Sequence, residues 1–115
     1  MEEIKLTILE LYGIRNQLAG IVVNELKIKG FINESGLSEG IKRRANRVLK
    51  IVLNELEPIN TQLDVIRISK DTVKEKELLS DTITISIEKL DFVIIENISL
   101  SDNYQLLYET IFKNS

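Results

Sequence analysis

The chain has 115 residues, of which 43% are hydrophobic and 29% are charged, and its formal net charge at pH 7 is −3. These values are typical of one soluble globular domain, and we expect residues 1–115 to form a single domain. The chain contains neither Cys nor His, which excludes disulfides, thiolate metal sites, the strongest nucleophile and the most common general base. We therefore expect no enzyme activity, no metal and no cofactor.

The acidic start MEEIKLTI does not resemble a signal peptide. No apolar run reaches the roughly 18 residues that a membrane span needs. We therefore expect a cytosolic protein without a membrane partner. The negative net charge argues against a general nucleic-acid binder.

In the N-terminal part, the spacing of apolar residues changes from every second residue to every third or fourth. Residues 2–8 alternate apolar and polar side chains, which predicts a short strand, with a fully helical start as the alternative. From Leu9 the apolar residues follow a helical period, which predicts a helix ending near Lys29–Gly30. Those residues are Leu11, Ile14, Leu18, Ile21, Val22 and Leu26. Residues 31–37 contain turn formers, and so short a link predicts an antiparallel pair of helices.

The segment 38–66 is the longest periodic stretch. Ser38 is a plausible N-cap, and Pro58 predicts a kink or break near Leu56–Glu57. Apolar residues recur every three or four positions, so one face of this helix should pack on a core. They are Ile41, Ala45, Val48, Val52, Leu56, Ile59, Leu63 and Ile66, with Leu49 and Leu53 beside them.

The C-terminal part reads as loop, strands and a short helix. Residues 67–77 are polar and predict a loop or a frayed extension of the long helix. Residues 82–88 alternate with β-branched side chains, and they are the best strand in the chain. A turn at 89–91 and a second strand at 92–95 should follow. Ser101 should cap a final helix with an apolar face formed by Tyr104, Leu107, Tyr108 and Ile111.

These elements predict an α+β fold that is mostly helical. An antiparallel helical hairpin would pack on a small sheet of two or three strands, followed by a short C-terminal helix. The strand at Ile4–Ile8 is the natural partner of Thr82–Glu88. A sheet of two strands is marginal alone and has exposed edges, so we expect a homo-oligomer.

A basic cluster opens the long helix, where the helix dipole disfavours positive charge. It consists of Lys42, Arg43, Arg44 and Arg47. The simplest interpretation is a solvated helix face. The alternative is an anion site, because the guanidinium fork suits phosphate, and an oligomer could bring several copies around one pocket. Phe31 could reach Arg43 or Arg44 across the turn and stack on a ligand.

Five segments together cover nearly the whole chain and suggest a family. They are IKLTILEL (4–11), IKRRANRVLK (41–50), LNELEPIN (53–60), KEKELLSDTITISIEKLDF (74–92) and ISLSDNYQLLYETIF (98–112). In this order they resemble short bacteriophage and prophage proteins of unassigned function. Those relatives often carry longer charged inserts where this chain has residues 67–73, which leaves the length of the second helix open. The resemblance implies a phage origin and action in the host bacterial cytoplasm, but no activity.

Two functions are compatible with these features. The first is an oligomeric sponge that sequesters an anionic, nucleotide-like host immune signal through Arg43, Arg44, Arg47, Lys42 and Phe31. We place it first because it explains why cations lie at the start of a helix. The alternative is a protein-interaction module, either a virion or assembly component or an inhibitor of a host protein. A nucleic-acid binder that uses the same cluster is the weakest hypothesis at this net charge.

Overall fold

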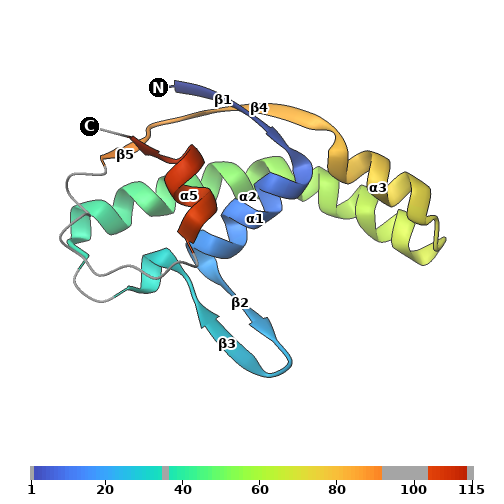
Figure 1. Ribbon diagram of the computed structural model, residues 1–115, viewed down its shortest axis with the longest axis horizontal. Helices are drawn as coiled ribbons and strands as arrows, with labels where there is room; N and C mark the ends of the chain where they lie inside the picture. Colours follow the sequence, from blue (N-terminus) through green and yellow to red (C-terminus); the bar gives the residue numbers. More distant parts are fainter. Residues whose placement is uncertain (1, 35–36, 92–103, 114–115) are drawn as a thin grey trace.

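The computed structural model describes residues 2–34, 37–91 and 104–113, and the fold is α+β and mostly helical, as predicted. Figure 1 shows α2 (Glu39–Ile68) as the long axis of the fold, from whose vicinity a two-stranded hairpin projects. The elements in chain order are β1 (Glu2–Thr7), α1 (Ile8–Ala19), β2 (Gly20–Val23), β3 (Leu26–Lys29), a 3-10 turn (Phe31–Asn33), α2 (Glu39–Ile68), α3 (Thr72–Ser80), β4 (Thr82–Ile87), β5 (Leu90–Asp91), α5 (Gln105–Thr110) and β6 (Phe112–Lys113).

Helix α2 confirms the long predicted helix. The Ile41 amide donates to the Ser38 hydroxyl oxygen at 3.2 Å, so Ser38 is the N-cap. Of the predicted kink or break at Pro58, the break is wrong, because the helix is continuous through this residue. Buried side chains on both sides of the proline hold the two halves on one core. The buried residues of α2 are Ile41, Ala45, Val48, Leu49, Val52, Leu56, Ile59 and Leu63.

The predicted pairing of the N-terminal strand is also confirmed. Strands β1 and β4 are antiparallel, and Ile4 lies opposite Ile85. Thr7 and Glu10 form a capping box at the switch from β1 to α1: the Thr7 amide donates to Glu10 at 2.9 Å, and the Glu10 amide donates to the Thr7 hydroxyl oxygen at 3.1 Å. The capping box gives the physical reason why the period changes at this residue.

The predicted helix over 9–29 is wrong beyond Ala19. Gly20 ends α1 with φ of 86°, and the chain turns into the antiparallel hairpin β2–β3, which projects away from the body (Figure 1). Asn24 and Glu25 form its two-residue turn with φ of 50° and 68°. Positive φ at both positions is the type I′ geometry that matches the twist of a hairpin. The β-branched run from Ile21 to Val23 favours the strand over the helix.

The two antiparallel helices are therefore joined by other elements than the short turn that was predicted. Helix α1 packs on α2 and crosses it in roughly the opposite direction, but β2–β3 and the 3-10 turn lie between them in the chain (Figure 1). Residues 67–77 were predicted as a loop or a frayed extension of the long helix. Instead, α2 ends at Ile68, and Thr72–Ser80 form a separate helix, α3, which folds back on the end of α2. The Lys74 amide donates to the Asp71 carboxylate at 3.1 Å, so Asp71 caps this helix.

The C-terminal segment covers α1. Helix α5 confirms the predicted terminal helix, and the Leu107 amide donates to the Gln17 side-chain oxygen of α1 at 3.1 Å. Strands β5 and β6 pair in parallel, so residues 90–91, expected in a turn, are part of a strand. The predicted strand at 92–95 and the predicted cap at Ser101 lie outside the described residues.

A close backbone contact joins the hairpin to the end of α1. A Cβ atom on Gly30 would lie 2.3 Å from the Ala19 carbonyl carbon and 2.3 Å from the Gly20 nitrogen. Such distances cannot be relieved by a side-chain rotation, because both neighbours are backbone atoms.

We expect Gly30→Ala to lower the free energy of unfolding by about 3 kcal/mol or more, because the methyl group forces the hairpin off α1. Urea denaturation followed by circular dichroism measures the change. Gly40→Ala is the matched control, because the nearest atom to its Cβ is 3.9 Å away. We expect that control to stabilise the protein by about 0.5–1 kcal/mol. Equal stability of the two variants would contradict the close contact.

Candidate functional site

The predicted arginines form an open ridge on α2. Arg43, Arg44 and Arg47 are exposed, and Lys42 is half-buried. The Arg43 Nε donates to the Glu39 carbonyl oxygen at 3.4 Å. Arg47 lies 3.9 Å from the Glu88 carboxylate, with 70% and 61% of the two side chains exposed, so this ion pair is weak. The three arginines are thus accessible on a convex helix surface. We call them the arginine ridge.

The prediction that Phe31 contacts a ligand is wrong. Its side chain is completely buried and meets the Tyr104 ring edge-to-face, with 5.8 Å between the ring centroids. The Tyr104 hydroxyl donates to the Glu34 carboxylate at 2.5 Å. Phe31 is therefore a core residue that joins the 3-10 turn to the C-terminal segment, and its ring has no exposed surface for stacking.

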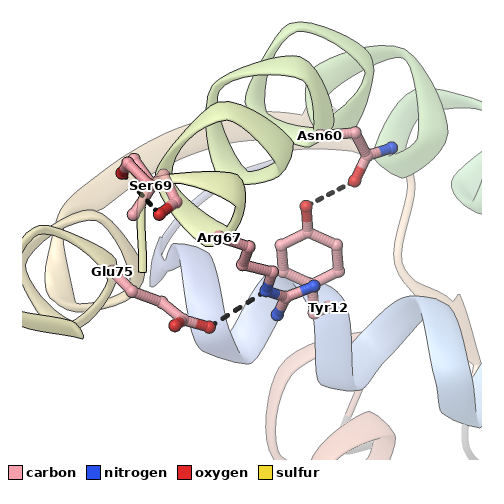
Figure 2. A network of polar contacts seen from close by, with 6 residues as sticks. Tyr12, Asn60, Arg67, Ser69 and Glu75 are labelled. Carbon is pink, nitrogen blue, oxygen red and sulfur yellow. Dashed lines mark hydrogen bonds and ion pairs between the residues drawn. The ribbon is translucent and has the colours of Figure 1, made fainter. Parts of the chain in front are cut away.

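A polar cleft that the sequence did not indicate lies between α1, α2 and α3 (Figure 2). Its volume is about 530 Å³. The Tyr12 hydroxyl donates to the Asn60 side-chain oxygen across the cleft. Arg67 also lines it, and the Arg67 Nε donates to Glu75 at 3.0 Å, which ties α2 to α3. Three helices therefore meet through hydrogen bonds at this cleft.

The charges around Tyr12 have opposing effects on the pKa of its phenol. Burial raises the pKa of Tyr12 above its usual value of 10.0, and the nearby Asp64 carboxylate adds to the rise. Arg67 and Arg15 lower this pKa, but burial has the larger effect. The phenol is therefore neutral at pH 7 and acts as a hydrogen-bond donor. At pH 7 this protonated phenol does not act as a general base.

Neither a metal-binding cluster nor a membrane-spanning helix is found in the described part of the chain. The ranges 2–34, 37–91 and 104–113 contain no group of three His, Cys, Asp or Glu side chains that could hold a metal ion. In the same part of the chain, no helix is long and apolar enough to span a membrane.

The β2–β3 hairpin carries an apolar face whose outer part is left exposed by the described elements. Residues that alternate along a strand share a face, and the register pairs Ile21 with Ile28 and Val23 with Leu26. We call these four residues the hairpin apolar face. Val23 is 45% exposed, Leu26 71% and Ile28 41%. The signal in the sequence was the Asn24–Glu25 pair between two short apolar runs.

Comparisons with known proteins add no function to these surfaces. No family model, no curated protein and no solved structure matches the chain. The resemblance to short phage proteins therefore stays a prediction. The function has to be inferred from the surfaces themselves.

We expect Tyr12→Phe to lower the free energy of unfolding by about 1 kcal/mol at pH 7, because it leaves Asn60 without its donor. The difference from the wild type should shrink as the pH rises above 10. In that range the unfolded wild-type chain loses its phenol proton before the folded chain does, since the folded pKa is raised.

Urea denaturation at several pH values measures this difference, and a double-mutant cycle with Asn60→Ala isolates the hydrogen bond. Additive effects of the two substitutions would contradict the bond between Tyr12 and Asn60.

Proposed function

We propose that this chain is a non-enzymatic, phage-type binding protein that works by protein–protein contact through the hairpin apolar face. One observation carries the proposal: a projecting two-stranded hairpin exposes Val23, Leu26 and Ile28 on one face. An isolated hairpin of this length is marginally stable in water, and exposed apolar patches on soluble proteins mark sites of interaction. A partner that covers Val23, Leu26 and Ile28 would stabilise the hairpin.

The occupant that we propose is a second copy of the chain. A two-fold interface brings the same surface of both copies together, so it has to be self-complementary. The hairpin apolar face meets this condition because it carries no charge. The opposite face of the hairpin carries Lys27 and Lys29, which would repel their own copies. Face-to-face packing of two hairpins places these lysines on the outside of the dimer.

The cellular role that we propose follows from this contact. A small, stable oligomer with further exposed surfaces serves either as a virion or assembly component or as an inhibitor of a host protein. In both cases it acts in the cytoplasm of the host bacterium. The phage role rests on the resemblance to phage proteins, and the hairpin supports only the protein–protein contact.

We expect light scattering to give about twice the chain mass of 13.2 kDa at high protein concentration. The double variant Val23→Thr/Leu26→Thr should shift the protein to the monomer, because it removes apolar surface while β-branched threonine retains the strand preference. Circular dichroism verifies that the variant is folded.

The matched control is Val65→Thr/Ile68→Thr, which removes apolar side chains that are 63% and 82% exposed at the end of α2. This control should leave the mass unchanged. A monomeric wild type at every concentration would refute the proposed dimer.

Capture of an anionic, nucleotide-like host immune signal is the second candidate, and the accessibility of the arginine ridge favours it. Arg43 and Arg44 form no ion pair among the described residues, and the pair of Arg47 is weak. The ridge is convex in one copy, so a ligand would have to lie between ridges of two or more copies. This candidate therefore also needs an oligomer.

A thermal-shift screen with cyclic and ADP-ribose-type nucleotides tests this candidate. One nucleotide should raise the melting temperature, since a ligand that binds only the native state stabilises it. Arg43→Ala/Arg47→Ala should abolish the shift, and Lys74→Ala/Lys76→Ala on α3 should preserve it at the same change in charge. The absence of any shift across the panel would leave the hairpin contact as the proposed function.

A further inference from the structure

The face of the β2–β3 hairpin that carries Lys27 and Lys29 borders a cleft lined by cations. This cleft lies between the end of α1, the hairpin and the 3-10 turn, and its volume is about 610 Å³. Small-molecule sites in proteins typically have volumes of about 300–1,000 Å³. Its lining includes Arg15, Lys27 and Lys29 as cations and Asn33 as a neutral hydrogen-bonding group, and no Asp or Glu.

The cations come from two elements that are fixed relative to each other. Arg15 lies on α1 and is half-buried, whereas both lysines lie on β3 and are exposed. Lys27 lies opposite Val22 and Lys29 lies opposite Gly20, so the two lysines share the face that turns away from the hairpin apolar face. The close contact of Gly30 with the end of α1 fixes the base of the hairpin. The backbone positions of Arg15, Lys27 and Lys29 are therefore fixed relative to one another before any ligand arrives.

Among the described residues, none of these three cations is paired with a carboxylate. Over residues 2–34, 37–91 and 104–113, no carboxylate lies within ion-pair distance of Arg15, Lys27 or Lys29. The chain has 18 acidic and 15 basic residues, so carboxylates are in excess over cations. Three cations in one lining that contains no carboxylate are consequently an uneven distribution of charge in this chain. Their mutual repulsion is relieved when an anion enters the cleft.

We propose that this cleft is a binding site for a small molecule that carries a phosphate dianion. The guanidinium of Arg15 offers the forked geometry that phosphate accepts, and the two lysines supply point charges. The Asn33 amide adds a neutral donor. Three cations match a charge of about −2 better than the single charge of a carboxylate. The site is separate from the arginine ridge. Ile21 and Ile28 of the hairpin apolar face also line the cleft, whereas Val23 and Leu26, which the dimer test replaces, are not in its lining.

The test is a titration of the full chain with inorganic phosphate at constant ionic strength, followed by amide chemical shifts in ¹⁵N-labelled protein. We expect saturable shifts at Arg15, Gly20 and the amides of residues 27–33. Arg15→Gln/Lys27→Gln should weaken binding at least about tenfold, as expected for the loss of charge-assisted hydrogen bonds. Lys74→Gln/Lys76→Gln on α3 removes the same charge and should leave the affinity unchanged.

Three results would overturn the proposal. The first is the absence of saturation, and the second is equal weakening by both double variants, which would mean diffuse attraction. The third is a lower melting temperature of Lys29→Gln at unchanged phosphate binding, which would mean that the lysine only neutralises the carbonyl end of α1.

A parallel titration with glycerol 3-phosphate distinguishes the source of the ligand. Tighter binding of the ester indicates a phosphorylated organic ligand, and equal binding indicates free phosphate. Either result supports the site. Light scattering of the same samples keeps the outcome for the dimer separate, because a monomeric protein that binds phosphate would refute only the dimer.

Discussion

The apolar stripe of α2 is the constraint on which the rest of the structure depends. Its buried residues run from Ile41 to Leu63, and α2 is longer than any other helix in the described part of the chain. No single neighbour can cover it, so α1, α3, β4, β5 and the 3-10 turn each cover a part. The chain therefore forms one core around one helix, and the β1–β4 pair is stabilised by packing on that core rather than by its own two strands.

The parts of the fold that could be predicted are those in which a single period dominates. The stripe of α2 and the alternation in β4 allow one interpretation each. The hairpin at 20–29 was mispredicted because Ile21, Val22 and Leu26 fit a helical face as well as two short strands. The left-handed backbone at Asn24 and Glu25 decided between them. Helix α3 was missed because its polar sequence has no stripe, and the cap at Asp71 with packing on α2 stabilises it instead.

Local periodicity also determines which parts of the candidate sites could be predicted from the sequence. Charged residues on the polar side of a predicted helix are exposed almost by definition, so the accessibility of the arginine ridge followed from the period alone. Phe31 was misassigned because its partner Tyr104 is distant in the chain, and no local pattern indicates such a contact. The cationic cleft was also invisible, because Arg15 on α1 and the lysines on β3 come together only when the hairpin forms.

The contact between Gly30 and the end of α1 has a consequence for how this protein can diversify. The hairpin meets the body at its base, where Gly20 and Gly30 have no room for a side chain, while residues 22–29 are exposed. Substitutions or insertions beyond this base would leave the core unchanged and alter only the projecting surface. Homologues under pressure to change partners could thus exchange the hairpin as a unit. In such a lineage we would expect the two glycines to be invariant and the strands between them to vary fastest.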